Sequence, residues 1–265
     1  MSLFRLTAAG LLLGAPAAAY AQQTEEGPIC TDRPTKANAV CTVPAGKWQL
    51  ESTVAGWGRI EDGGARADVW TIGSSFLKLG LTDRSDLEIG VTPYVHVDTK
   101  VAGNKSSVSG FGDVTVRYKH RLTGEGSKVQ VAAIPFVKLP TADRNIGNGK
   151  VEGGLAVPVS MAVGSATLTF GPEADLVADA DGDGRHFAVV NLVNLAGPVA
   201  PGLTLVGELW TATNFDPVDT VTLASADAAI AYAVNNNLQL DLGSNIGLNR
   251  NTPDIELYAG VSVRF

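Results

Sequence analysis

The chain ends in the stretch Asp254-Ile-Glu-Leu-Tyr-Ala-Gly-Val-Ser-Val-Arg-Phe265. Every second residue from Ile255 onward is apolar, and the residues between them are charged, small or hydroxyl-bearing. A period of two is that of a β-strand whose two faces meet different surroundings. Because a membrane-crossing β-strand needs only about 9–11 tilted residues, this stretch is long enough to span a bilayer. It predicts the closing strand of a transmembrane β-barrel.

Eleven earlier segments repeat this alternation, some of them less regularly, and the composition of residues 226–233 would also suit a helix. The predicted strands cover residues 47–58, 68–80, 86–98, 113–122, 128–139, 150–163, 166–178, 185–196, 202–214, 220–234, 238–247 and 254–265. An even count is the rule for bacterial single-chain barrels. The fold class predicted for residues 47–265 is therefore all-β, a single antiparallel barrel of about twelve strands.

The connections between these segments are unequal in length. Long outer loops are predicted at residues 59–67, 99–110 and 140–149, whereas the turns between them are shorter, as in known barrels. Four prolines fall inside predicted strands, at positions 93, 135, 158 and 172. Each removes a ladder hydrogen bond, and a closed barrel has no edge strand to tolerate it. The sequence therefore predicts bulges or shifted strand boundaries there.

The N-terminal region has the features of an exported protein. Arg5, an apolar core and an Ala-x-Ala site predict a signal peptide over residues 1–21, cleaved after Ala21. Residues 22–46 are predicted to form a short periplasmic extension ahead of the barrel. Because export leads to an oxidising compartment, Cys30 and Cys41 are predicted to form a disulfide.

The composition narrows the class of protein. A net charge of −7 argues against a nucleic-acid partner. No stretch after residue 21 has the roughly eighteen apolar residues of a membrane helix, yet 45% of the chain is hydrophobic. An outer-membrane barrel fits this combination, and a secreted β-sandwich is the soluble alternative.

Several short blocks also resemble a known family. Thr31-Asp32-Arg33-Pro34, the block Val43–Glu51, Gly110-Phe-Gly-Asp113 and the C-terminal Gly260–Phe265 are similar to outer-membrane proteins grouped with meta-pathway phenol degradation. After Pro34, where such members tend to continue with an acidic, Ser-containing stretch, this chain has Thr35-Lys-Ala37. The resemblance implies a transporter-like barrel and does not establish phenol as the solute.

Charged residues on the inward parity of the strands are the candidate functional residues. The basic ones are Arg117, Lys119, Arg121 and Lys138, and the acidic ones are Glu152, Glu173, Asp175, Glu208, Asp227, Asp241 and Glu256. A basic strip facing an acidic wall would create a transverse field in a wet lumen, which is one form of selectivity lining. Alternatively, the same charges pair across the lumen and fill it, since buried ions need partners.

Other chemistry has weaker signals. The stretch Asp179-Ala-Asp-Gly-Asp-Gly184 resembles half of a calcium loop, but Val190 stands where a bidentate Glu would be required, so a solvated loop tip is the preferred interpretation. The motifs Gly-x-Ser-x-Gly and His-Glu-x-x-His are absent from the sequence. No catalytic residue, metal or other cofactor is therefore predicted.

The predicted function is that of a bacterial outer-membrane channel for the passive passage of small solutes, including small organic or aromatic compounds. A closed structural or surface-interaction barrel without transport is the alternative. The expected partners are outer-membrane lipid, the barrel-assembly machinery and the solute, and the sequence does not fix the oligomeric state.

Overall fold

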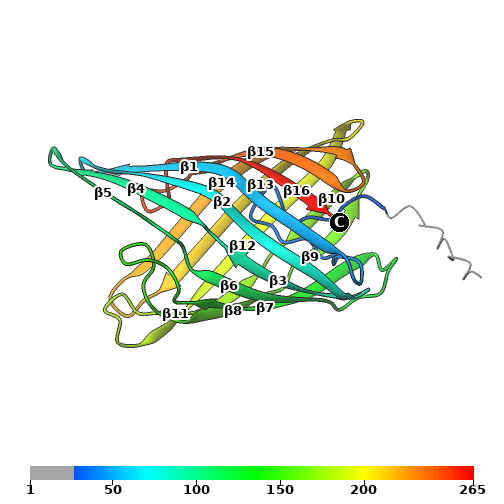
Figure 1. The fold of residues 1–265 in the computed structure, drawn as a ribbon, viewed down its shortest axis with the longest axis horizontal. Helices are drawn as coiled ribbons and strands as arrows, with labels where there is room; N and C mark the ends of the chain where they lie inside the picture. The colour runs from blue at the N-terminus through cyan, green and yellow to red at the C-terminus, as the bar shows by residue number, and fades with distance from the viewer. Residues whose placement is uncertain (1–26) are drawn as a thin grey trace, which may run out of the picture.

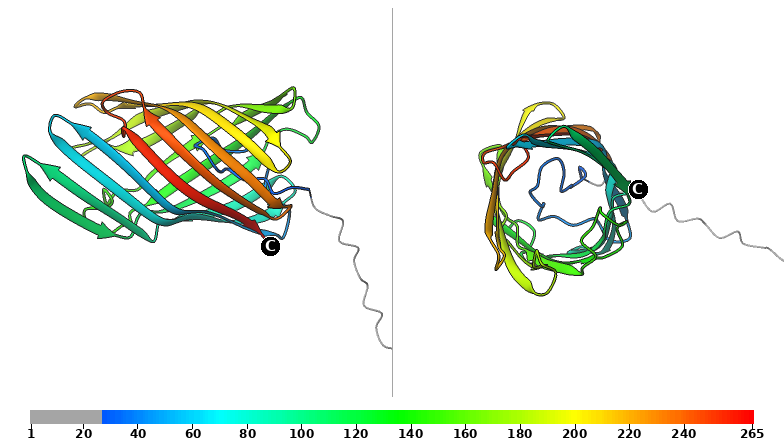
Figure 2. Two further views of the ribbon diagram at one scale, coloured as in Figure 1. Left: turned by 90° about the horizontal axis from the view of Figure 1, so that it is seen from above. Right: turned by 90° about the vertical axis from the view of Figure 1, so that its left-hand side faces the viewer.

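In the computed structural model, which describes residues 27–265, the chain forms a closed antiparallel barrel of twelve strands (Figures 1 and 2). The predicted signal peptide and its cleavage site lie outside the described residues. β1 (Trp48–Asp62) pairs with β2 (Ala65–Thr82) on one side and with the last strand, β16 (Ile255–Arg264), on the other, which closes the wall. Residues 27–265 contain no helix long and apolar enough to cross a membrane.

Sixteen uninterrupted strands build the twelve strands of the wall. They are β1 (Trp48–Asp62), β2 (Ala65–Thr82), β3 (Ser85–Val91), β4 (Tyr94–Val101), β5 (Asn104–Gly110), β6 (Val114–Arg121), β7 (Val129–Leu139), β8 (Glu152–Ala156), β9 (Val159–Val163), β10 (Ala166–Phe170), β11 (Glu173–Ala178), β12 (Arg185–Ala200), β13 (Leu203–Phe215), β14 (Thr220–Asn235), β15 (Leu238–Gly247) and β16 (Ile255–Arg264). The pairs β3–β4, β5–β6, β8–β9 and β10–β11 are each one strand of the wall with an interruption.

Proline accounts for most of these interruptions, as the sequence predicts. Pro93 separates β3 from β4, Pro158 separates β8 from β9, and Pro172 separates β10 from β11. Pro135 stays within β7, opposite Leu155 of β8. A residue without an N–H ends the ladder locally, and the chain resumes pairing one or two residues later.

Two predicted outer loops, at residues 59–67 and 99–110, are wrong. β1 and β2 pair as far as Asp62 and Ala65, and β4 and β5 pair as far as Val101 and Asn104. Two-residue turns with positive φ, such as Gly63 (56°) and Gly64 (83°), allow such tight hairpins. The two hairpins therefore extend the wall at the end opposite the C-terminus (Figure 1). We call this end the hairpin end and the other the terminal end.

The alternation of the strands sorts side chains between lipid and lumen. On β16 the polar parity is buried, with Ser262 at 0% and Arg264 at 5% exposure, whereas Leu257 of the apolar parity is 45% exposed. The same holds for β6, where Lys119 faces inward and Tyr118 outward. Residues 226–233 lie in β14 and are strand, since pairing on both sides outweighs the helical preference of their alanines. The buried interior is thus largely polar.

The outward apolar band gives a prediction of stability. Leu242 lies near the middle of β15 and is 55% exposed on the outer face. Leu242→Arg should lower the free energy of unfolding by about 2–4 kcal/mol, because a cation would sit in hydrocarbon. Urea unfolding in lipid vesicles, followed by tryptophan fluorescence, measures this loss.

Leu248→Arg is the matched control, since Leu248 is similarly exposed but follows the end of β15. Equal losses from both substitutions would contradict a lipid-facing band on β15.

Candidate functional site

The segment from Gly27 to Gly46 folds into the barrel and adds no strand to its wall. The end-on view in Figure 2 shows it as a blue loop inside the ring of strands. A disulfide between Cys30 and Cys41, whose Cα atoms are 6.3 Å apart, closes its central part. The sequence predicts that this segment lies ahead of the barrel as a periplasmic extension, whereas in the structure it lies in the lumen. Its charged side chains match those of the inner wall. We call residues 27–46 the luminal segment.

Asp32 of the luminal segment meets the basic side of the wall. Its carboxylate lies 2.6 Å from Nζ of Lys119 and 2.5 Å from Nζ of Lys78. Arg117 Nη2 is 3.6 Å away. These three cations project inward from β2 and β6 at 2% exposure for both lysine side chains. Asp32 is therefore the anion on which Arg117 and Lys119 of the predicted basic strip converge, together with Lys78, which was not predicted from the sequence.

The wall supplies two further anions to this cluster. Glu51 Oε1 lies 2.7 Å from Lys78 Nζ, and Glu88 Oε2 lies 3.0 Å from Arg117 Nε. Glu51 and Glu88 are the described wall carboxylates within ion-pair distance of these three cations, and Asp32 supplies a third. Asp86 of β3 is buried opposite Lys119 and accepts the N–H of Val43 from the luminal segment at 2.9 Å. Burial by itself would raise the pKa of Asp32, but the charges of Lys119, Lys78 and Arg117 outweigh it and hold the pKa well below its usual value.

Two cations of the luminal segment meet the acidic side. Arg33 donates from Nε and Nη2 to the two carboxylate oxygens of Asp241, at 3.0 and 2.6 Å. Lys36 Nζ lies 2.6 Å from Asp227. Glu208 accepts the backbone N–H groups of Lys36 and Ala37, both at 3.0 Å. Paired charge-assisted hydrogen bonds of this kind hold the luminal segment in one position and also neutralise the charges of the two partners.

The wall is shaped to receive Arg33. A Cβ atom added at Gly260 of β16 would overlap the guanidinium, so the missing side chain leaves the space that Arg33 fills. The ring of Tyr258 lies beside it, 5.9 Å from Cζ of Arg33 to the ring centroid. A residue larger than glycine at position 260 would therefore displace Arg33 from Asp241.

The remaining predicted lining residues have partners within the wall or border cavities. Lys138 binds Asp113 at 2.7 Å and Glu152 at 3.2 Å, Arg121 binds Glu125 at 3.0 Å, and Glu256 accepts from Asn245 at 2.8 Å. Glu173 borders a cavity, and Asp175 packs over Gly154 of β8.

Two cavities remain between the luminal segment and the wall. The larger, about 610 Å³, lies towards the terminal end. Apolar and hydroxyl side chains dominate its wall side, for example Met161, Ala162, Thr167, Thr169, Ala196 and Val206. The smaller, about 270 Å³, is lined by Pro158, Leu192 and Trp210 together with the charged Lys36, Arg117 and Glu173. Asn38 lines both cavities and so lies between them, and its Oδ1 accepts a hydrogen bond from Arg117 Nη2.

Comparison with known proteins places the chain in a family. The family model described as "Putative MetA-pathway of phenol degradation" matches residues 31–265. The chain belongs to this family. The match within this phenol-degradation family begins at Thr31 and so includes Asp32, Arg33 and Lys36 as well as the barrel. No curated protein matches the chain.

Solved structures share the fold of this family member at low sequence identity. An outer membrane channel from Pseudomonas putida F1 has a TM-score of 0.68 and 15% identity, covering 85% of this chain and 98% of its own. The beta domain of the Bordetella autotransporter BrkA has a TM-score of 0.52 and 13% identity, covering 84% and 100%. The similarity concerns the architecture of the barrel.

The charge balance around Asp32 gives a prediction. Asp32→Asn should lower the free energy of unfolding by about 3–5 kcal/mol, because three buried cations would then share two ion-paired carboxylates, Glu51 and Glu88. Urea unfolding in lipid vesicles measures the loss. Asp32→Asn combined with Lys78→Met should recover part of it, since two cations then face Glu51 and Glu88.

Asp62→Asn is the control, because Asp62 is exposed at the tip of the β1–β2 hairpin. A double variant less stable than Asp32→Asn alone would contradict the charge-balance explanation.

Proposed function

We propose that this protein is an outer-membrane channel for the passive passage of small solutes, with a route that runs beside the luminal segment. The observation that carries the proposal is that two cavities lie beside the luminal segment and share Asn38 in their linings. In this proposal the terminal end faces the periplasm and the hairpin end faces outward, as short turns and long connections are arranged in known barrels. A solute passes from the smaller cavity, past Asn38, to the larger one.

The lining of the larger cavity suggests the class of solute. The luminal segment engages Lys78, Lys119, Asp227 and Asp241 in ion pairs, so these charges do not face the route. Asp32, Arg33, Lys36 and Arg117 line the cavities but are held in ion pairs. The apolar and hydroxyl side chains on the wall side of the larger cavity offer no fixed charge to replace the hydration shell of an ion. We therefore propose small, uncharged organic solutes, a class that includes simple aromatic compounds.

The narrowest part of the route gives the first test. Asn38→Trp should slow the swelling of proteoliposomes in an uncharged aromatic alcohol several-fold, because an indole would fill the passage between the cavities. Asn38→Ala should leave the swelling equal or faster. Ser107→Trp, on the exposed β4–β5 hairpin, is the control for adding an indole.

Absence of swelling with the natural protein would favour the closed, structural barrel. Equal swelling for Asn38→Trp and the natural protein would place the route elsewhere.

The acidic wall gives a second test. Arg33→Met with Lys36→Met leaves the carboxylates of Asp241 and Asp227 facing the lumen without their cations. A ring of exposed carboxylates favours cations, so the reversal potential in a KCl gradient should shift towards that of potassium. Planar-bilayer recording measures the shift.

Lys100→Met with Lys105→Met removes the same charge from the exposed β4–β5 hairpin and should leave the reversal potential close to that of the natural protein. A larger shift from this control pair would contradict the proposed role of Arg33 and Lys36.

A further inference from the structure

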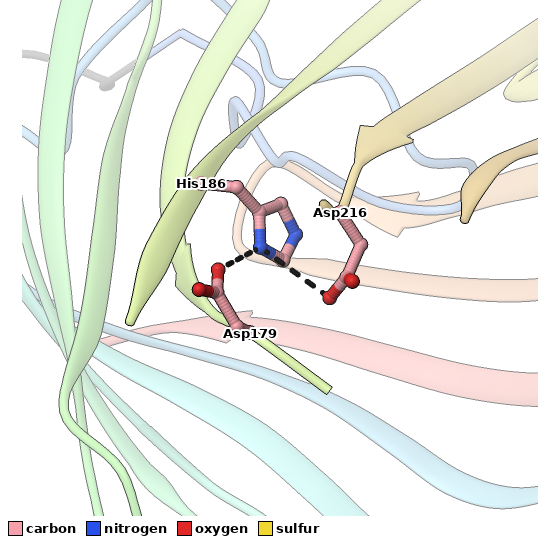
Figure 3. Close-up of side chains that lie close together, drawn as sticks. All are labelled: Asp179, His186 and Asp216. Atoms are coloured by element: carbon pink, nitrogen blue, oxygen red, sulfur yellow. Dashed lines mark hydrogen bonds and ion pairs between the residues drawn. The ribbon is translucent and has the colours of Figure 1, made fainter. Parts of the chain in front are cut away.

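Asp179, His186 and Asp216 converge on one another (Figure 3) and line neither of the two cavities described above. The connections that carry the two aspartates lie at the hairpin end of the barrel. Asp179 lies in the connection between β11 and β12, and Asp216 lies in the connection between β13 and β14. His186 is the second residue of β12 and points inward, like Ala188 two residues later. Among residues 27–265, these three form the single group of three or more metal-ligating side chains whose donor atoms converge.

The donor atoms lie close enough to share one ion. His186 Nδ1 is 2.7 Å from Asp179 Oδ1 and 3.6 Å from Asp216 Oδ2. All three atoms lie within 4.8 Å of one another. The side chain of His186 is 5% exposed, that of Asp216 is 9% and that of Asp179 is 14%. The group is thus enclosed but borders the outer mouth.

The contact made by the other imidazole nitrogen, Nε2, determines whether Nδ1 is available as a metal ligand. His186 Nε2 contacts Oδ1 of Asn214. An amide oxygen can only accept, so Nε2 carries the hydrogen and donates it. In the neutral ring, Nδ1 then presents its lone pair between two carboxylates. Three electron-rich atoms facing one another are unfavourable unless a proton on Nδ1 or a metal cation lies between them, and Nδ1 and Asp179 Oδ1 are within hydrogen-bond distance. A hydrogen bond that orients a histidine in this manner accompanies almost every histidine that binds a metal.

The carboxylates are also held in place from outside the group. Asp216 Oδ2 accepts the N–H of Ala180 at 2.7 Å, and Oδ1 accepts the N–H of Val218 at 2.8 Å. These hydrogen bonds fix the orientation of the Asp216 carboxylate. A Cβ added at Gly184 would overlap the carboxylate of Asp179, so the loop closes tightly around that side chain.

We propose that Asp179, His186 and Asp216 form a binding site for a divalent first-row transition ion such as Zn²⁺, with water completing its coordination. One imidazole nitrogen and two carboxylate oxygens are a donor set that such ions accept. At Zn²⁺–ligand distances of about 2.0–2.2 Å, tetrahedral ligand atoms lie about 3.3 Å apart. The separations of 2.7 and 3.6 Å therefore need only small side-chain movements.

Calcium fits this arrangement less well. Calcium takes six to eight oxygen ligands, whereas here a nitrogen lies between the two carboxylates. Asp181 accepts the N–H of Asp183 at 2.9 Å and does not join the group. The structure thus brings Asp179 together with His186 and Asp216 instead of with the acidic residues that follow it in sequence.

A bound ion would join two neighbouring outer connections of the barrel. It would tie the β11–β12 connection to the β13–β14 connection through β12, at the mouth of the lumen. This inference does not depend on which solute passes, or on whether one passes.

Calorimetric titration with Zn²⁺ tests the site on the untagged mature protein in detergent, after treatment with a chelator. The natural protein should take up one Zn²⁺ per chain. His186→Gln and Asp216→Asn should each weaken binding by more than about tenfold, since even the loss of a group that orients a metal ligand has that effect. Asn214→Ala tests the orienting contact and should weaken binding by roughly 10–100-fold.

His96→Gln is the matched control. His96 also lies towards the hairpin end and pairs with Asp98 at 3.2 Å, but with one carboxylate only, and its loss should leave the titration unchanged. Heat-dependent gel mobility establishes that each variant is a folded barrel. If the natural protein takes up no Zn²⁺, or titrates like both His186→Gln and Asp216→Asn, a proton on His186 fills the gap and the proposal is wrong.

Discussion

The ion pairs of Asp32 are the constraint on which the interior depends. Lys78, Arg117 and Lys119 project from the wall into the lumen, where Glu51 and Glu88 are the two described wall carboxylates within ion-pair distance of them. Removing an ion from water costs several kcal/mol unless a partner is close. A third anion, Asp32, comes from the segment that precedes the wall, and this fixes that segment inside the barrel. Its cations then neutralise the acidic side, and the volume left over forms the two cavities.

The strands could be predicted from the sequence because lipid and water impose opposite demands on alternate residues. This rule holds only where the wall crosses the membrane. Beyond the membrane, both faces of the β1–β2 and β4–β5 hairpins meet water, so the alternation of apolar and polar residues fades. The sequence therefore predicted loops where the strands in fact continue. The turn signal was present in Gly63-Gly64, because a pair of glycines suits a two-residue hairpin turn. The charged residues around it, Arg59, Glu61, Asp62 and Arg66, favoured the prediction of a loop instead.

The inward charges could be predicted by parity, but their partners could not. Lys119 and Asp32 are far apart in sequence, and the luminal segment has no periodicity that would indicate which wall it meets. From the sequence, the basic and acidic sides of the lumen could either face each other across water or form ion pairs directly with each other. The structure has a third arrangement, in which the luminal segment lies between them. The block Thr31–Pro34 carried a family resemblance, yet its role depends on contacts that only the closed barrel creates.

The luminal segment also lies across the seam where the first and last strands meet. Thr31 bonds Ser262 of β16 at 2.9 Å, and Arg33 bonds Thr53 of β1 at 2.6 Å while resting on Gly260 of β16. The seam joins residues at opposite ends of the chain, so its ladder closes the largest loop in the molecule. The luminal segment thus holds both edges of this junction together from inside the barrel, on the side that lipid never reaches.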